Sequence, residues 1–450
     1  MDSQTKQAKQ QQSKPHWLIN RNYRFLFFGQ AISLLGDQLS TFTIILWIVT
    51  IIAPGQSWGP LAISAVLTAS LVPNLLIGPL AGVFVDRWNP KMTMIRMDII
   101  RAFLTLLLVA STGVIPLPFL VHGRLPQLAQ LIVICVLTFL SSTCAQFFTP
   151  SYMGLIATIV SKEQRPQSAS LGQTMQAFAA IVGPPLAAPL LYTFGIKWAL
   201  LLDALSFIVS FLTISAIQSS SKATGHSEQS SFWREFKEGI YFSFSNTTVR
   251  TIVTTSFIAT LGAGAFDALY VFFLTGNLHT SASFTGIIAT ALGIGTIGGA
   301  FLASKIVPFL KLEHLLIYSL LGIGLCLVVI SRLTYFAPAL ILFLVFGIFL
   351  ASLRVASGPL LMNETPQTML GRVFAVLGPT SALASLFSAL LSGFLASVLL
   401  VNLHSHFLGM TFGPIDTIFV GVGILFLLSA LYASSALSKK VAQVEPVSMP

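Results

Sequence analysis

The stretch Gly82-Val83-Phe84-Val85-Asp86-Arg87-Trp88-Asn89-Pro90-Lys91 joins two long apolar runs, at about 60–84 and 93–114. Each run is long enough to cross a hydrocarbon core of about 30 Å as an α-helix. Backbone polar groups need partners within lipid, so we expect a helix along the whole of each run. The charged side chains are confined to the short link, which therefore predicts a turn between two neighbouring membrane spans.

The rest of the chain has the same character. Of its 450 residues, 55% are hydrophobic and only 8% are charged, and the mean hydropathy is +0.85. A soluble domain normally carries about 25% charged residues, so the composition excludes a soluble protein. The net charge of +10 does not indicate a nucleic-acid partner, because the basic residues lie in short loops between apolar runs.

Twelve apolar runs can be placed along the chain, and we expect each to be a transmembrane helix. They lie at about 25–49, 60–84, 93–114, 127–148, 168–192, 198–217, 251–275, 284–307, 314–331, 336–356, 373–400 and 414–435. The predicted fold class is an all-α membrane protein of two six-helix bundles, at 23–217 and 251–435. A cytosolic linker at 218–250 joins the bundles, and tails at 1–22 and 436–450 flank them; the first tail is expected to be disordered.

The distribution of Lys and Arg predicts the orientation. With the N-terminus inside, the outer loops hold only Arg124, Lys197 and Arg332, and Arg101 lies within a span. The remaining twenty fall at or near the inner side, which is the positive-inside pattern. We therefore expect a multi-pass protein of the cell membrane with both termini in the cytosol.

The linker contains the sequence Phe232-Trp233-Arg234-Glu235-Phe236-Lys237-Glu238-Gly239-Ile240-Tyr241. Its apolar residues at 232, 233, 236 and 240 share one helical face. This pattern predicts an amphipathic helix that lies in the membrane interface. A helix that binds a partner protein is the alternative.

The two halves share features at corresponding positions. The second span of each half is rich in glycine and precedes a basic loop, which ends at Lys91 in one half and at Lys311 in the other. The fifth span of each half holds a Gly-Pro pair, at 183–184 and 378–379. Paired six-span halves are an architecture of secondary transporters, whose substrate site lies between the halves near the midplane.

The order Gly82-x-x-x-Asp86-Arg87-x-x-x-Lys91 between spans 2 and 3 resembles the loop signature of the major facilitator superfamily. The resemblance implies a transporter that works by alternating access, in which this loop latches the two halves. In the family the loop aspartate faces the start of span 11, and this chain has Arg372 there, within Gly371-Arg372-Val373.

Anchoring of the topology is the alternative interpretation of the loop. Gly82 and Gly78 would form a small face for close helix packing. Asp86 would favour the positive end of span 3, and Arg87 and Lys91 would hold the loop inside.

Further stretches narrow the resemblance. In span 5, Gly183-Pro184-Pro185-Leu186-Ala187-Ala188 resembles the Gly-Pro motif of exporters, although alanines replace its second glycine pair, and a kink that serves packing is the alternative. GQAISLLGDQ at 29–38, LDALSF at 202–207 and GRVF at 371–374 resemble the branch that holds macrolide-efflux proteins and the enterobactin exporter. Many members of the superfamily carry an arginine in span 4, but residues 141–144 hold no charge here.

Four carboxylates lie inside spans, at Asp37, Asp98, Asp203 and Asp267. An ionisable group at membrane depth is a candidate functional residue. At about 1.5 Å per residue, Asp37 lies roughly 18 Å into span 1, near the midplane, and is the expected proton-coupling residue. A satisfied polar contact, to Gln38 or to a polar group on span 4 or 5, is the alternative. Asp98 is expected to pair with Arg101 at i+3. Asp203 and Asp267, placed nearer the outer side, are expected to form helix-to-helix hydrogen bonds or to take part in transport.

Enzyme signatures are absent from the sequence. It has no Walker A loop, no HExxH motif and no Cys/His cluster, so we expect no catalysis, no cofactor and no metal. His404 and His406 lie in an outer loop and are interpreted as solvated side chains rather than metal ligands.

The predicted function is proton-coupled export of an amphipathic or lipophilic small molecule, drug- or macrolide-like, by a monomer. A largely apolar cavity rich in Phe is expected to bind it. Export of a specific metabolite such as a siderophore is the alternative, which a basic side chain facing the cavity would favour; Arg101 and Arg354 are the candidates. A receptor or scaffold would need an extramembrane module, which the short loops do not supply.

Overall fold

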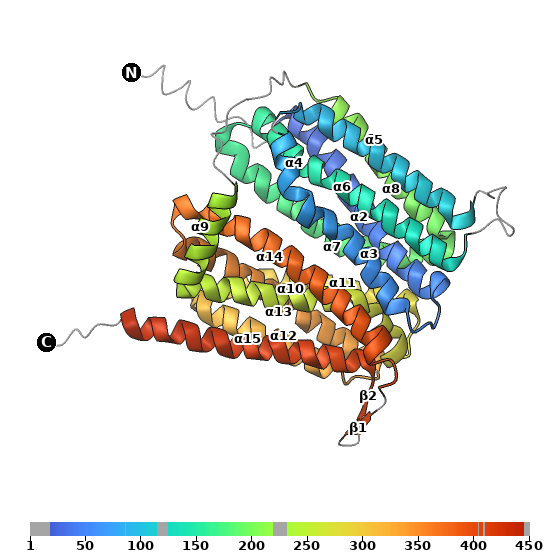
Figure 1. The fold of residues 1–450 in the computed structure, drawn as a ribbon. Helices are drawn as coiled ribbons and strands as arrows, with labels where there is room; N and C mark the ends of the chain where they lie inside the picture. The colour runs from blue at the N-terminus through green and yellow to red at the C-terminus, as the bar shows by residue number, and fades with distance from the viewer. Residues whose placement is uncertain are drawn as a thin grey trace, which may run out of the picture.

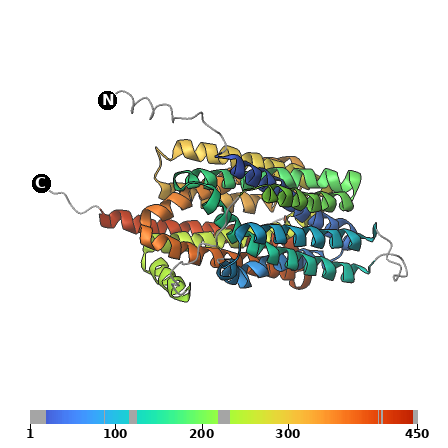
Figure 2. The ribbon, with the colours of Figure 1, turned by 90° about the horizontal axis from the view of Figure 1, so that it is seen from above.

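The computed structural model describes residues 19–85, 87–114, 125–218, 232–403, 405–407 and 410–444. They form two bundles of long helices (Figure 1, Figure 2). The N-terminal bundle consists of α2 (Arg21–Trp47), α3 (Gly59–Leu76), α4 (Gly78–Val85), α5 (Pro90–Val109), α6 (Gln127–Ile159), α7 (Arg165–Phe194) and α8 (Ile196–Ser215). The C-terminal bundle consists of α10 (Thr247–Phe272), α11 (Thr285–Ile306), α12 (Leu312–Ile330), α13 (Phe336–Glu364), α14 (Gln367–Phe394) and α15 (Pro414–Val444).

Shorter elements complete the described chain. The π-helical segments η1 (Ile48–Ile52), η2 (Ala110–Val114), η4 (Phe273–Asn277) and η6 (Leu395–Leu399) extend α2, α5, α10 and α14. The 3₁₀ turns η3 (Lys162–Gln164) and η5 (Ala282–Phe284) precede α7 and α11. The linker contains α9 (Phe232–Ser245), and β1 (Ser405–Phe407) pairs antiparallel with β2 (Met410–Phe412).

The helices match the twelve predicted spans. Eleven segments of the described chain are long and apolar enough to cross a membrane. The twelfth, α5, carries Arg96, Asp98 and Arg101 and packs against α6 and α8 within the N-terminal bundle. The second span is interrupted at Ile77, where Pro79 has no N–H to continue the helical hydrogen bonds. The predicted fold class, an all-α membrane protein of two six-helix bundles, is confirmed.

The two ends of the molecule differ. The start of α2, the end of α15 and α9 lie at one end, which we call the α9 end (Figure 1). The strands β1 and β2 lie at the other, the hairpin end. The linker holds the helix α9 where the sequence predicts an amphipathic helix. It packs on α14, with Tyr241 and Phe244 exposed.

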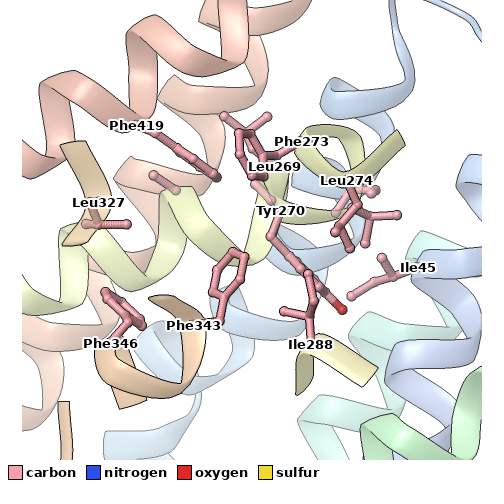
Figure 3. Close-up of a cluster of buried hydrophobic side chains, with 14 of the residues drawn as sticks. Ile45, Leu269, Tyr270, Phe273, Leu274, Ile288, Leu327, Phe343, Phe346 and Phe419 are labelled. Carbon is pink, nitrogen blue, oxygen red and sulfur yellow. The ribbon is translucent and has the colours of Figure 1, made fainter. Parts of the chain in front are cut away.

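The bundles meet in their hairpin-end halves. The backbone N–H of Leu61 on α3 donates to Ser397 Oγ on η6 at 3.1 Å. On the other side, Gly286 on α11 lies so close to α7 that a Cβ there would meet the carbonyl oxygen of Pro185 at 3.1 Å. An apolar core crosses the same boundary, with Ile45 of α2 and Leu274 of η4 in one buried cluster (Figure 3).

The bundles are apart at the α9 end. Gly82 on α4 and Gly378 on α14 both face open space, with no atom within 4 Å of a Cβ built on either residue. The described structure is therefore closed at the hairpin end and open at the α9 end.

Candidate functional site

A cavity of about 440 Å³ lies against α2, α6 and α7 in the half of the N-terminal bundle toward the α9 end. Phe148 is the one phenylalanine among its described lining residues. The prediction of a Phe-rich cavity is therefore wrong. Phenylalanines of the C-terminal bundle pack on one another instead: the Phe266 ring stacks 5.9 Å from Phe346 and 6.1 Å from Phe419.

Amide and hydroxyl side chains line this cavity, and sequence reasoning missed them. Gln30 on α2 and Gln173 and Gln176 on α7 belong to the lining, together with Tyr152 and Ser168. The available signal was the i, i+3 spacing of the two α7 glutamines inside an apolar span, because polar side chains at membrane depth face a bundle interior or cavity.

Arg101 on α5 binds Asp37 on α2 at the edge of the cavity. Arg101 Nη2 donates to Asp37 Oδ1 at 2.6 Å, and Arg101 Nε donates to Ser141 Oγ on α6 at 3.3 Å. The guanidinium carbon lies 4.1 Å from the centroid of the Phe207 ring on α8, a cation–π arrangement. The positive charge that span 4 lacks is thus supplied from span 3, and one side chain joins four helices.

The predicted Asp98–Arg101 ion pair is wrong. Asp37 together with Ser141 and Phe207 offers the guanidinium more partners than Asp98 alone, and the long arginine side chain reaches them. Asp98 is 0% exposed, and neither of its carboxylate oxygens has a partner at hydrogen-bond geometry among the described residues. The Ser210 hydroxyl lies close to Asp98. It accepts a hydrogen bond from Gln30 Nε2, at 3.4 Å, and its own O–H can still donate.

Asp203 on α8 lies level with Asp37, and its predicted place nearer the outer side is wrong. A second cavity, of about 120 Å³, is lined by Asp37, Arg101 and Asp203 together, and a Cβ at Gly36 would lie 2.9 Å from Asp203 Oδ1. Asp203 is 4% exposed, and its Oδ1 has no partner among the described residues. Depth was counted in residues from the end of each predicted span. Because α2 is much longer than α8, the ends of the two helices do not lie at the same depth, and the count placed Asp203 too near the outer side.

Asp267 does not lie with Asp37, Arg101 and Asp203. It is exposed on α10 of the C-terminal bundle and does not line the cavity that holds Asp37.

Parts of the candidate latch are visible, although Asp86 lies outside the described residues. Lys91 Nζ donates to the carbonyl oxygens of Ser215 and Ile217 at 2.9 and 2.8 Å, so it caps the end of α8. Arg87 is exposed. The close helix packing predicted for Gly82 is wrong for this structure, because the bundles are separated at this end.

Arg372, the expected latch partner on α14, is engaged by the linker helix. Its Nη1 lies 2.7 Å from Glu238 Oε2 on α9. Gly239, the next residue of α9, lies against the Arg372 carbonyl and leaves no room for a side chain.

Gly183 and Pro184 are buried in α7. A Cβ on Gly183 would meet the Cβ of Gln38 on α2 at 2.5 Å, so the glycine allows the two helices to pack closely. The neighbouring Pro185 carries the contact with α11 described above. The motif therefore lies where α7 packs on both α2 and the other bundle.

Comparisons with known proteins agree with this architecture. The model of the family described as transmembrane secretion effector matches residues 15–404. The chain is 26% identical over 447 residues to the uncharacterized MFS-type transporter YkuC of Bacillus subtilis, covering 96% of this chain and 95% of that protein. It is 22% identical over 390 residues to macrolide efflux protein A of Streptococcus pyogenes, covering 85% and 92% of the two chains.

Solved structures share the fold at low sequence identity. The nucleoside transporter NupG matches with a TM-score of 0.66 at 12% identity, covering 93% of this chain and 99% of that one. A bacterial homologue of the iron transporter ferroportin in an inward-facing state matches with a TM-score of 0.65 at 14% identity, covering 92% and 97%. The family match spans most of the chain and the helices form the two bundles that it requires; the chain therefore belongs to the transmembrane secretion effector family of the major facilitator superfamily, whose members are membrane transporters and not enzymes.

Proposed function

We propose that this protein is a proton-coupled exporter of amphipathic small molecules that works as a monomer by alternating access. The observation that carries the proposal is the Asp37–Arg101 ion pair, which lies at the edge of a cavity toward the α9 end. We place the α9 end in the cytosol, because the loops rich in Lys and Arg lie there. The described state is then inward-open.

The ion pair supplies a site where proton and substrate can compete. Asp37 is 33% exposed and lines the cavity, so an occupant of the cavity can reach it. Opposite charges attract strongly where the dielectric constant is low. A proton on Asp37 cancels that attraction and frees α2 to move relative to α5. A proton arriving from outside and leaving into the cytosol would thereby be exchanged for a substrate that leaves the cell.

The lining of the cavity supports an amphipathic substrate. Its volume lies within the usual range for small-molecule sites, about 300–1,000 Å³. Gln173 and Gln176 offer hydrogen bonds, while Leu34, Met153 and Ile156 offer apolar contact. The name of one relative, macrolide efflux protein A, supports a drug-like molecule and the outward direction.

An anionic metabolite such as a siderophore fits the cavity less well. Arg101 already holds Asp37, and Arg354, the other candidate, does not belong to the described lining.

The test is Asp37→Asn, which keeps the shape of the side chain but cannot ionise. Inverted membrane vesicles would be energised, and uptake of a radiolabelled macrolide would be measured with and without an uncoupler. We expect Asp37→Asn to abolish uphill uptake, to at least tenfold below wild type, while substrate exchange without a gradient persists. Asp267→Asn is the matched control, because Asp267 is a span carboxylate outside the cavity. Full uphill uptake by well-expressed Asp37→Asn protein would refute the proposal.

A further inference from the structure

The charge cluster of the N-terminal bundle holds more carboxylates than cations. Asp37 and Asp203 line one small cavity with Arg101, whose guanidinium is bound to Asp37. Asp98 lies three residues before Arg101 on α5. Asp98 and Asp203 are almost completely buried, at 0% and 4% exposed. Three of their four carboxylate oxygens have no partner at normal hydrogen-bond geometry among the described residues. The groups closest to them are the neutral hydroxyls of Ser210, beside Asp98, and Ser40, beside Asp203.

Among the described residues, no further positive charge lies at this level: Arg96 on α5 is exposed, and Lys91 is bound at the end of α8. α8, which carries Asp203, packs against α2, α5 and α7. The only titratable side chains of α7 are Arg165 and Tyr192, close to its two ends. α6, which packs against α5, places Cys144 and Tyr152 in this half of the bundle, and neither can carry a positive charge.

We infer that Asp98 and Asp203 each hold a proton in the inward-open state. A buried carboxylate that is ionised and has no counter-ion is far less stable than the neutral acid, because its charge is not compensated. One guanidinium balances one carboxylate, so the cluster is neutral only if the other two are protonated. These are two proton sites in addition to Asp37.

The shared cavity makes Asp203 the alternative partner of Arg101. When Asp37 accepts a proton, the guanidinium loses its counter-ion and Asp203, which lines the same cavity of about 120 Å³, can take that place. Asp203 then releases its own proton. One proton is gained by Asp37 and one is lost by Asp203, so the net charge of the cluster does not change. The use of this exchange in transport rests on the proposed function, whereas the protonation of the two acids does not.

Infrared difference spectroscopy of the purified full-length protein tests the protonation directly. A protonated carboxylic acid gives a C=O stretching band that shifts in D₂O and disappears when alkaline pH removes the proton. We expect two such bands from the cluster. Asp98→Asn and Asp203→Asn should each remove one, and both variants should fold because asparagine has the shape of the neutral acid. Asp416→Asn is the matched control. Asp416 is buried but paired with Arg332, so we expect it to be ionised, and the spectrum of this variant should lose no acid band.

Two further variants test the exchange. In Asp37→Asn, Arg101 is left to capture Asp203, so the Asp203 band should disappear although Asp203 is present. In Arg101→Gln, Asp37 loses its counter-ion, so a third acid band should appear and should be absent from the double variant with Asp37→Asn.

The outcomes separate this inference from the proposed function. Acid bands that survive Asp98→Asn and Asp203→Asn unchanged would overturn the inference, and so would an Asp203 band that persists in Asp37→Asn. Neither result depends on transport. Uphill uptake that survives Asp37→Asn would instead refute the proposed function and leave the band assignments in place.

Discussion

Arg101 illustrates how one residue can organise a bundle interior. Its guanidinium contacts groups on α2, α6 and α8 while its backbone belongs to α5. Charged side chains at membrane depth are costly and are retained where they pair. The contacts of Arg101 therefore join four helices, and one of them holds Asp37, which lines the cavity.

At this scale we expect Arg101→Gln to destabilise the protein. Removing one partner of a buried ion pair typically costs about 3–5 kcal/mol. The cost here should be lower, about 1–3 kcal/mol, because Asp37 is 33% exposed and can take up a proton instead. The midpoint of thermal unfolding of the purified protein should fall, and adding Asp37→Asn should recover more than half of the loss. Additive losses in the double variant would show that the two residues do not stabilise each other.

At the scale of elements, we expect two carboxylates to compete for Arg372, one on α9 and one in the loop after α4. Glu238 on α9 binds Arg372 in the open structure. The resemblance to the superfamily assigns Asp86 to the same end of α14. Because α9 lies tightly on α14 at Gly239, it keeps Glu238 beside Arg372 while the α9 end is open.

We expect Glu238→Gln to favour closure at the α9 end, because Arg372 becomes available to Asp86. Labels at Ser161→Cys and Asn363→Cys, both exposed at that end, would report the distance between the bundles in a background without native cysteines. The closed population should rise at most about fivefold, since an exposed ion pair contributes up to about 1 kcal/mol.

The controls for this prediction come from the same surface. Asp86→Asn should have the opposite effect, and Lys237→Gln, an exposed change on α9, should have none. An unchanged distance distribution in Glu238→Gln would show that α9 does not compete with the loop.

At the scale of the whole molecule, the two bundles are in contact at the hairpin end. Contacts between α3 and η6 and between α7 and α11 hold the hairpin end shut, while the cavity lies toward the α9 end. An exporter needs this state in order to receive its substrate from the cytosol, provided that the α9 end is cytosolic.

That orientation predicts the labelling pattern of single cysteines. In a background without native cysteines, Lys237→Cys on α9 should resist an impermeant thiol reagent in intact cells and react after permeabilisation. Ser281→Cys, exposed before η5 at the hairpin end, should react in intact cells. The reverse pattern would show that the α9 end faces outward and that the cavity opens to the outside of the cell.

Much of the architecture could be predicted from the sequence. The positions of the twelve spans, the linker helix and the division into halves follow from apolar runs and charge placement, because lipid requires every spanning backbone to satisfy its own hydrogen bonds. The resemblance carried by residues 82–91 agrees with the family match over residues 15–404. Asp37 and Arg101 could likewise be selected, because ionisable residues at membrane depth are few.

Only the tertiary structure decided how those residues are paired. Local spacing favoured Asp98 as the partner of Arg101, but the guanidinium reaches across to α2, and Asp203 from α8 enters the same small cavity. Residue spacing in the sequence gives distances along a single helix. Ion pairs and cavities depend instead on the packing, offset and length of several helices. The composition likewise suggested a cavity lined by phenylalanine, but packing stacks the partly buried Phe266 against Phe346 and Phe419 in the other bundle. The sequence by itself thus determined which side chains lie within the membrane, and the packing of α2, α5 and α8 decided which of them meet.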